Sequence, residues 1–436
     1  MIFSIKSSSA KPLLALAILF AGVALSYALP VTDRTARVQS NFPAQSCPVI
    51  STAGVTTALL PSTKIATRFI DGKSTSFKNF SPSEITLRAN ALLVDSNPGI
   101  ALSYSALPTS GIAAVPCSSG NPDQWFIGGS GGVTSKGLLS LVNSGLSESL
   151  VDIYPYTSKG ALAALPVKVK ANSSATVSLD ALAPGEDSMA LHVVTRTGRT
   201  ATFLLDQRVK GLRALGMDFV KPSDGPQTKV VISGLYPHTG PKSTIAHFIR
   251  LLAPGPLDAT VRIHIISGDG SFLPVGFDGF LLKHGSVVTV PLANLTTTST
   301  FGLEIESDRP ILTGALTTVG TNEFAWAAPV SALTDTSMNF GGHTPTLTFL
   351  GKSIRVVLSG QYSTGKSFAQ TIAGSDIAFW APKAGVKMVH FLLSPNSGIY
   401  VGGLFNTDGL TYFPIASGAA IENTAPPFSD VHTLTH

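Results

Sequence analysis

The chain has 436 residues, of which 44% are hydrophobic and only 13% are charged, and it contains 41 Gly and 29 Pro. So few charged residues leave little material for the outer faces of amphipathic helices, whereas abundant Gly and Pro suit short strands joined by tight turns. The net charge of +5 is spread along the chain, which excludes the clustered basic surface of a nucleic-acid-binding protein.

The N-terminus carries the pattern of an export signal. Lys6 and Lys11 precede an apolar run from Pro12 to Leu25, and Ser26-Tyr27-Ala28 places small residues at the −3 and −1 positions of a cleavage site. We interpret residues 1–29 as a signal peptide or as a retained membrane anchor. Both alternatives stay open, because the run is close to the shortest length that spans a bilayer. Lysines on the N-terminal side orient either version with the body of the protein outside the membrane.

The two cysteines of the chain predict a disulfide. Residues 30–46 are polar and aperiodic, and we interpret them as a linker; Cys47 follows at once, and Cys117 lies further along. An even number of cysteines in an exported chain favours one bond between them. A bond that closes so long a loop adds roughly a few kcal/mol to stability. The alternative is two free, buried thiols.

Strand-like runs bounded by Gly, Pro, Asn and Ser dominate the rest of the chain. Two such runs separated by a turn recur in segments 191–205, 303–316 and 388–404, and other runs align between copies at a spacing of about one hundred residues. This hairpin-like repeat predicts an all-β chain of tandem immunoglobulin-like β-sandwiches. The predicted domains are an incomplete first block at 47–120, sandwiches at 121–225, 226–335 and 336–417, and a disordered tail at 418–436.

A phosphate-loop pattern occurs in the last predicted domain. Gly360 to Ser367 fits G-x-x-x-x-G-K-[ST] at every fixed position. A true site continues into a helix whose N-terminus binds the phosphate. The residues after Lys366 reach Gly374 too soon for such a helix, and the equivalent segments 157–160 and 267–270 are typical of turns. We therefore predict a hairpin turn here, and no nucleotide as a partner.

A serine-nucleophile pattern occurs at Gly128–Gly132, which fits G-x-S-x-G around Ser130. A nucleophile elbow continues from a strand through a sharp turn into a helix. The repeats instead predict a strand at 138–143, because its counterpart in the next block contains prolines that no helix interior tolerates. We therefore predict a flexible glycine loop and assign no catalytic role to Ser130.

The remaining polar patterns predict no catalytic, metal or cofactor site. Glu304 and Glu306 share one face of a predicted strand, about 7 Å apart by strand rise, which is typical of a solvated face; the alternative is a pair of glycosidase carboxylates. The nine histidines show no zinc spacing, and His432 and His436, which have helical spacing, lie in the predicted tail.

Three tryptophans are candidates for a ligand surface. Trp125, Trp326 and Trp380 could present indole rings on which sugars stack. The alternative is that they fill sandwich cores or the joints between domains.

Several segments together resemble a known family. They are Cys117, 125–129 (WFIGG), 141–145 (LVNSG), 182–187 (LAPGED) and 307–315 (SDRPILTGA). In these segments the chain resembles an uncharacterised actinobacterial envelope family that is catalogued only as a domain of unknown function. The resemblance covers roughly 47–415. It implies an exported, membrane-anchored protein of β-sandwich repeats with no assigned catalytic residues, although this chain has less charge and more Ser and Thr than that family leads us to expect.

These patterns predict a non-enzymatic protein of the cell envelope, secreted or anchored to the membrane outside the cytoplasm. It would act as a scaffold or interaction module, with an envelope protein or a cell-wall glycan as its partner. One alternative is a module that binds carbohydrate or another cell-wall polymer. A second is an exported hydrolase that uses Ser130 or paired carboxylates. Since the repeats share their strands and differ in their turns, we expect function in the turns and in the seams between blocks.

Overall fold

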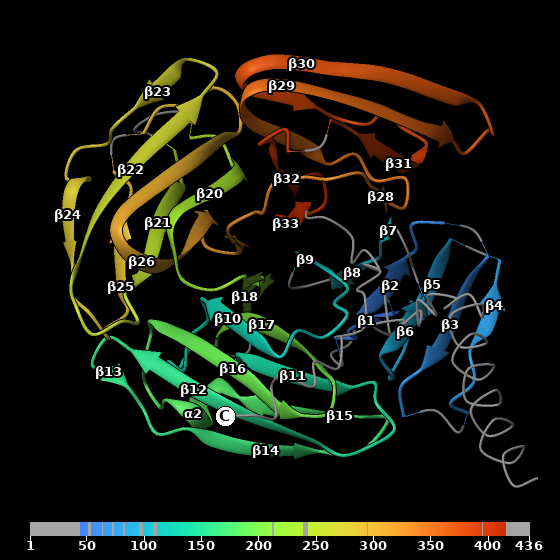
Figure 1. The fold of residues 1–436 in the computed structure, drawn as a ribbon, viewed down its shortest axis with the longest axis horizontal. Helices are drawn as coiled ribbons and strands as arrows, with labels where there is room; N and C mark the ends of the chain where they lie inside the picture. Colours follow the sequence, from blue (N-terminus) through green and yellow to red (C-terminus); the bar gives the residue numbers. More distant parts are fainter. Residues whose placement is uncertain are drawn as a thin grey trace, which may run out of the picture. The chain divides into compact units, whose positions relative to one another are not determined.

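The protein is built almost entirely of β-strands (Figure 1). A computed structural model describes residues 44–50, 54–62, 64–71, 74–81, 83–95, 99–107, 111–211, 213–238, 243–293, 295–394 and 396–415. Within these ranges α2 (Leu179–Leu182) is the one helix, and no helix has the length and hydropathy to cross a membrane. The predicted all-β class is confirmed. The predicted signal or anchor at 1–29 and the tail at 418–436 lie outside the described residues.

The strands form four consecutive blocks along the chain, and blocks 1 and 2 consist of many short strands. Block 1 comprises β1 (Ala44–Cys47), β2 (Val55–Leu59), β3 (Ile65–Phe69), β4 (Lys78–Phe80), β5 (Glu84–Leu87), β6 (Leu92–Asp95), β7 (Gly99–Ile100), β8 (Leu102–Leu107) and β9 (Gly111–Pro116). Block 2 comprises β10 (Asp123–Ile127), β11 (Leu138–Asn143), β12 (Ser149–Thr157), β13 (Gly160–Ala161), β14 (Leu165–Val169), β15 (Ser173–Ser178), β16 (Met189–Thr197), β17 (Thr200–Lys210), β18 (Arg213–Val220) and β19 (Pro222–Ser223).

The second pair of blocks uses fewer, longer strands. Block 3 comprises β20 (Gln227–Leu235), β21 (Ile245–Leu252), β22 (Ala259–Ser267), β23 (Gly270–Phe272), β24 (Asp278–Leu282), β25 (Val288–Pro291), β26 (Phe301–Val319) and β27 (Glu323–Ala327). Block 4 comprises β28 (Thr336–Asn339), β29 (Thr346–Tyr362), β30 (Ser367–Trp380), β31 (Val386–Leu392), β32 (Tyr400–Phe405) and β33 (Thr411–Ile415).

Each block packs two antiparallel sheets, which we call inner and outer. The inner sheets run β5-β2-β8-β9 in block 1 and β15-β11-β17-β18 in block 2, and the outer sheets are β1-β6-β3-β4 and the sheet of β10, β12 and β16. In block 3 the long β26 belongs to both, pairing with β20 and β22 in one half and with β21 and β27 in the other. In block 4, β29 does the same, pairing with β32 and then β31.

The recurrent pair of strands is not a hairpin, which corrects the interpretation of the repeat. In block 2, β16 pairs with β10 and β12 in the outer sheet, whereas β17 pairs with β11 and β18 in the inner sheet. In block 3 the first half of β26 pairs with β20 and β22 in one sheet, and the second half pairs with β21 and β27 in the other. In block 4, β31 and β32 likewise pair with different halves of β29 and so belong to different sheets. The turn between the two runs is therefore where the chain crosses from one sheet to the other.

Block 1 contains both sheets, so it does not lack strands as expected of an incomplete repeat. The end of the predicted linker also differs, because residues 44–46 belong to β1, which pairs with β6. All four blocks lie within one compact unit, Phe42–Ala420. The predicted disulfide is confirmed: Cys47 at the end of β1 bonds to Cys117 just after β9, which ties the outer sheet of block 1 to the inner one.

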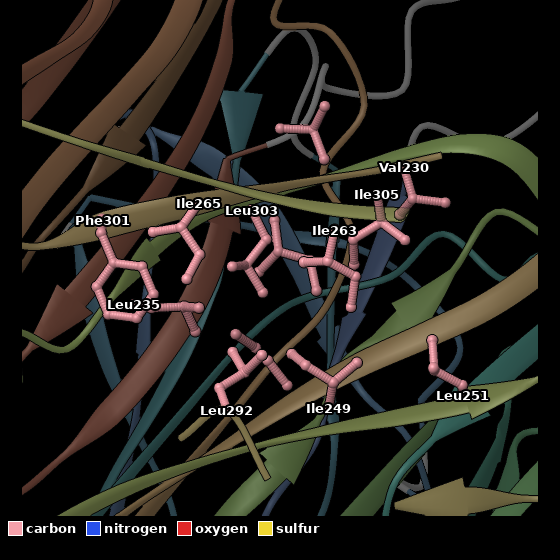
Figure 2. Close-up of a cluster of buried hydrophobic side chains, with 14 of the residues drawn as sticks. Val230, Leu235, Ile249, Leu251, Ile263, Ile265, Leu292, Phe301, Leu303 and Ile305 are labelled. Carbon is pink, nitrogen blue, oxygen red and sulfur yellow. The ribbon is translucent and has the colours of Figure 1, made fainter. Parts of the chain in front are cut away.

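The core of each block lies between its two sheets, as block 3 illustrates. Figure 2 shows Ile263 of β22 beside Ile305 of β26, its cross-strand partner in the outer sheet. Alternate residues of a strand point to opposite faces, so Arg262 and Glu304 point away while their neighbours are fully buried. Burial of such a side chain contributes about 1.5–3 kcal/mol, and the block 3 cluster is extensive.

The blocks meet through one strand near the end of each block and through close backbone contacts. In cyclic order β9, β18, β27 and β33 each contact the next, and β33 contacts β9. Blocks 1 and 4 are also joined by β7, which pairs in parallel with β28. A Cβ atom at Gly314 in block 3 would lie 2.4 Å from the carbonyl oxygen of Ile127 in block 2. The seams between blocks therefore depend on glycine where two backbones approach each other.

Candidate functional site

A buried polar network, which we call the hub, joins all four blocks. Lys221 Nζ donates to both carboxylate oxygens of Asp218 at 2.8 Å. The same carboxylate accepts hydrogen bonds from the backbone N–H of Trp326 in block 3 at 2.7 Å and from Thr411 Oγ1 in block 4 at 2.6 Å. Thr411 Oγ1 accepts a hydrogen bond from the backbone N–H of Ala114 in block 1 at 2.9 Å. One carboxylate therefore links the ends of four sandwiches.

The hub holds the blocks together and offers no open position for a substrate. Both side chains of the ion pair are fully buried. Burial raises the pKa of the Asp218 carboxyl and lowers the pKa of the Lys221 ammonium, and the attraction between the two groups opposes both shifts. Since protein donors from three blocks surround the carboxylate, we assign the pair a structural role.

The seam between blocks 1 and 4 holds an open cavity of about 690 Å³, which we call the seam groove. Its floor is one face of the outer sheet of block 4, where side chains form two rows across neighbouring strands. One row is Ser337, His390 and Ser359, and the next is Met388, Gln361 and Ser367. The alternating neighbours Leu358 and Val389 are buried in the core on the opposite face. The strand period therefore turns one set of residues into a core and the other into a binding surface.

Block 1 supplies the opposite wall of the seam groove. This wall consists of Pro61, Ser62, Lys64, Ile65 and Asp95. The two walls meet where Gly99 of β7 pairs with Ser337 of β28. A Cβ atom at Gly99 would lie 2.4 Å from Cβ of Pro61 and 2.7 Å from Ser337 Oγ. Glycine at this position therefore allows block 1 to approach block 4 closely along one side of the groove.

The seam groove offers many hydrogen-bonding groups and little net charge. Among the described residues that line it, Lys64 is the one lysine or arginine and Asp95 the one carboxylate, and serine hydroxyls, an amide and an imidazole make up most of the other polar groups. Phe368 alternates with Ser367, so its ring packs on the core side of the sheet against Tyr362 and Trp380. Hydroxyl and amide groups exchange hydrogen bonds with uncharged polar ligands. This surface suits an uncharged ligand that is rich in hydroxyl groups.

The groove brings together residue types of a serine-nucleophile site without the required hydrogen bonds. Ser337 and Ser359 are cross-strand neighbours of His390, and Asp95 lines the same cavity. Nucleophilic catalysis needs the serine hydroxyl bonded to a base that a third group orients. Among the described residues, the histidine side chains that form hydrogen bonds are His192, His247 and His284. His390, the histidine of the groove, is not among them.

The predicted turn at the phosphate-loop pattern is confirmed. β29 continues to Tyr362 and β30 begins at Ser367, with Gln361 opposite Ser367 in the ladder. The backbone N–H of Gly365 donates to the carbonyl of Tyr362 at 2.9 Å, which closes the turn. β30 then continues as a strand to Trp380, so no helix N-terminus faces the loop. Residues Gly360, Gln361 and Ser367 contribute to the seam groove instead.

The glycine loop around Ser130 is packed, which corrects the expectation that it is flexible. Ser130 is 8% exposed, and its hydroxyl accepts a hydrogen bond from the backbone N–H of Gly132 at 3.0 Å. A Cβ atom at Gly131 would lie 2.1 Å from the carbonyl oxygen of Ala183, so the loop presses against the end of α2. The strand β11 follows the loop, as predicted. The strand–turn–helix geometry of a nucleophile elbow is therefore missing at this segment.

The three tryptophans lie in cores and seams. Trp125, Trp326 and Trp380 are 6%, 1% and 8% exposed. Trp125 stacks on His192 with ring centroids 3.9 Å apart. Nε1 of Trp326 donates to Asp206 at 2.8 Å, and Nε1 of Trp380 donates to Gln370 at 3.0 Å. Neighbouring rings and acceptors therefore already occupy these side chains, and we no longer consider them a ligand surface.

The other sequence candidates provide no reactive site in the described part of the chain. Lys229 Nζ lies 2.9 Å from Glu304 and 3.3 Å from Glu306, so an exposed ion-pair cluster covers that strand face. No group of three or more His, Cys, Asp or Glu side chains in this part could hold a metal ion. His432 and His436 lie outside the described residues.

Sequence reasoning missed the residues that form the seam groove. Ser337, Ser359 and Gln361 look like ordinary solvent-facing positions of strands. Their shared signal is the alternation with buried neighbours in two strands of one block, but the partner wall comes from residues about three hundred positions earlier. The pairing of β7 with β28 brings these walls together, and no local pattern in the sequence shows that pairing.

The match to known families covers blocks 2 and 3 with the end of block 1 and the beginning of block 4. A model of a family of unknown function, DUF5719, matches residues 96–372, which is more than half of the chain. The matched range begins just before β7 and ends within β30, so it is narrower than the resemblance suggested by the sequence. No curated protein and no solved structure matches the chain. The predicted resemblance to a family without an assigned function is confirmed: the chain belongs to the family of unknown function DUF5719.

Proposed function

We propose that this protein is a non-enzymatic scaffold of the cell envelope that binds an uncharged, hydroxyl-rich polymer, such as a cell-wall glycan, in the seam groove. The observation that carries the proposal is the groove itself. It is open, about 690 Å³ in volume and rich in hydroxyl groups. The hub fixes the blocks on both sides of it, so the groove is formed before a ligand binds, which reduces the entropic cost of binding.

A location outside the cytoplasm is supported by two observations. The disulfide between Cys47 and Cys117 is typical of an oxidising compartment. The pattern of Lys6, Lys11 and the apolar run that follows is typical of exported chains. In our proposal, residues 1–29 direct the chain across the membrane and either leave it or anchor it there.

A glycan fits the seam groove better than a peptide does. Peptides often bind by adding a strand to a free sheet edge. Three floor strands have no such edge, because β28 lies between β7 and β31, β31 lies between β28 and β29, and β29 lies between β31 and β30; β30, which supplies Ser367 at the end of a row, pairs with β29 alone. Recognition across the middle of this floor therefore uses side chains, and those side chains are hydroxyls, an amide and an imidazole. The balance of Lys64 and Asp95 disfavours a strongly charged polymer.

The experiment is a pulldown of the full chain with purified insoluble peptidoglycan. Ser359→Ala/Gln361→Ala removes one polar group from each row of the groove floor. We expect at least a tenfold loss of retained protein, because the two groups would face the ligand directly. The matched control is Thr260→Ala/Ser271→Ala, which changes exposed polar residues of block 3 that do not line the groove. Equal retention of the Ser359→Ala/Gln361→Ala variant and the parent would contradict the proposal.

The exported hydrolase is the rival function, since Ser359 and His390 are cross-strand neighbours. We expect no release of soluble fragments from peptidoglycan, no ester hydrolysis above background and no labelling by a fluorophosphonate. Turnover that disappears in Ser359→Ala would replace the scaffold by a serine hydrolase. Turnover that survives this substitution would overturn the non-enzymatic proposal and place the chemistry elsewhere.

A further inference from the structure

The strand β30 leaves one edge of block 4 free, and Figure 1 shows it at the outer border of that block. Among the described residues, β30 pairs with β29 alone, and its backbone from Ser367 to Gly374 bonds to no further segment. Most of these eight residues are exposed. Such an edge presents a row of unpaired N–H and C=O groups, on which another strand can pair.

This part of the edge lacks the protection that natural proteins give to free edges. Protected edges are short, or they carry lysine, proline or a bulge. The strand β14, which pairs with β12 alone among the described strands, shows this protection, because Pro166 and Lys168 lie within its five residues. Residues 367–374 (SFAQTIAG) contain no charged residue and no proline, over a length of about 26 Å by strand rise. Protection begins only beyond them, with a bulge in the ladder and the ion pair of Lys352 and Asp376.

The charges at the two ends of the free edge fit a second copy of the same chain. The exposed Lys366 lies just before the free segment, and the exposed Asp376 lies shortly after it. An antiparallel second copy centred on Gln370 places Lys366 diagonally across from the partner's Asp376, about 7–8 Å away. This contact forms twice, because the pairing has twofold symmetry. Opposite charges therefore meet at both ends, and the segment between them carries no charge that would repel the second copy.

The same register matches the side chains on both faces of the sheet. On the core side, Phe368 lies opposite the partner's Ile372, and an aromatic residue beside a β-branched one is a favourable cross-strand pair. On the other face, Ala369 lies opposite the partner's Thr371, and both side chains are small. Strand alternation puts Ser367 of the seam groove on this second face too. We propose that two copies of the chain pair antiparallel through the free edge of β30 and form one continuous sheet across a dimer.

The dimer places two seam grooves on one face of the continuous sheet, and the use of this arrangement rests on the proposed function. Cross-strand neighbours share a face, so the groove floors of both copies face the same way. In this register Ser367 and the partner's Ser367, which end the two floors, are about 20 Å apart along the strands by strand rise. One polymer chain can therefore reach both grooves, and its second contact is intramolecular.

Sedimentation velocity of the full chain tests the dimer in the absence of any polymer. We expect a shift from monomer to dimer between about 1 and about 200 µM, because dimerisation follows mass action. Ala369→Lys/Thr371→Lys places like charges directly opposite each other across the pair, so we expect dimerisation at least tenfold weaker. The matched control is Thr260→Lys/Ser271→Lys, which adds the same charge at exposed positions of block 3 and should dimerise as the parent does.

A variant of opposite charge makes the outcome decisive. Ala369→Glu/Thr371→Glu alone should also stay monomeric, and an equimolar mixture of the lysine and glutamate variants should recover the dimer. Either variant carries the test alone if the other does not fold. A parent that stays monomeric over the whole range, a dimer that both variants keep, or a mixture that stays monomeric would overturn the proposal. Ser359→Ala/Gln361→Ala should dimerise as the parent does, so loss of polymer binding and loss of the dimer are distinguished.

Discussion

Block 4 meets block 3 through a closed seam and block 1 through an open one. At the closed seam, Ser233 Oγ donates to the carbonyl of Thr348 at 2.7 Å, and the hydroxyls of Thr300 and Thr348 lie 2.7 Å apart. A Cβ atom at Gly402 would lie only 1.9 Å from the carbonyl oxygen of Ser233. Backbone packs directly on backbone, and no space remains for a ligand at this contact.

The open seam is fastened beside its cavity instead. Asn339 Nδ2 donates to the carbonyls of Leu60 and Ser83 at 3.0 and 2.9 Å, and Lys387 pairs with Glu84 at 2.7 Å. These contacts are made by side chains, which bridge a gap between the two blocks. The backbones of blocks 1 and 4 therefore stay separated, and the seam groove remains open beside them. The two seams of block 4 therefore differ in role. Backbone contacts at the closed seam stabilise the assembly, whereas bridging side chains at the open seam leave space for a ligand.

The largest expected effect comes from the hub, which supports both seams. Asp218→Asn leaves the Lys221 ammonium buried without a negative partner. We expect the free energy of unfolding, measured by urea denaturation, to fall by about 3–5 kcal/mol. Asp278→Asn is the control, because it breaks the exposed ion pair with Arg262 and should cost less than about 1 kcal/mol. Equal losses in the two variants would show that the hub does not bind the blocks together.

Much of the fold could be predicted because it depends on local pattern. The alternation of Val261, Ile263 and Ile265 identifies a strand and its buried face, and β22 has both as predicted. The turn after β29 follows from glycine and from a segment too short for a helix. The cysteine pair follows from its even number in an exported chain. Each of these inferences needs only residues that are near in sequence, or a count.

The pairing of strands and the seams could not be predicted, because they depend on distant residues. A period of two shows which face of a strand is buried, but it does not show which strand lies beside it. The run before and the run after the turn at Gly198 therefore looked like a hairpin, although they lie in opposite sheets. Likewise, the contact between Gly99 and Ser337 could not be predicted, because it depends on the pairing of β7 with the distant strand β28.

The backbone contact at the closed seam should leave no room for an added methyl group. Gly402→Ala tests this expectation. The new methyl group would meet the carbonyl oxygen of Ser233, a backbone atom that cannot rotate away. We expect the free energy of unfolding to fall by about 3 kcal/mol, at the upper end for an overpacked site. In the control Gly255→Ala, nothing lies within 4 Å of the new methyl group. A loss of similar size in the control would refute the seam as the cause.

Acid should weaken the interior of block 3, because a histidine is buried there. Burial lowers the pKa of His247 to about 3. Below the unfolded value near 6.5, the unfolded chain binds a proton that the folded chain does not, so stability falls as pH falls from 6.5 toward 3. The slope reaches about 1.4 kcal/mol per pH unit, or about 2 kcal/mol between pH 6.5 and pH 5. Urea denaturation across this range measures it.

Two substitutions separate the contribution of His247 from those of other titrating groups. His247→Gln keeps a side chain that can bond to Thr317 but removes the titration, so the slope should decrease by the amount expected for one histidine. Thr260→Ala, the control, changes an exposed residue of the same block that does not titrate, and the slope should stay as in the parent. An unchanged slope in His247→Gln would mean that its burial does not control the acid response.

The smallest effect on stability is expected in the seam groove. Ser359 is partly buried and Gln361 is exposed, and both project from a sheet whose core lies on the opposite face. Ser359→Ala/Gln361→Ala should therefore change the free energy of unfolding by less than about 0.5 kcal/mol, as judged by the urea midpoint, while the retention on peptidoglycan falls. A large loss of stability would assign these side chains to holding the seam together. A stable variant that no longer binds would show that the open seam is kept open for a ligand, since nothing else in the fold would depend on those side chains.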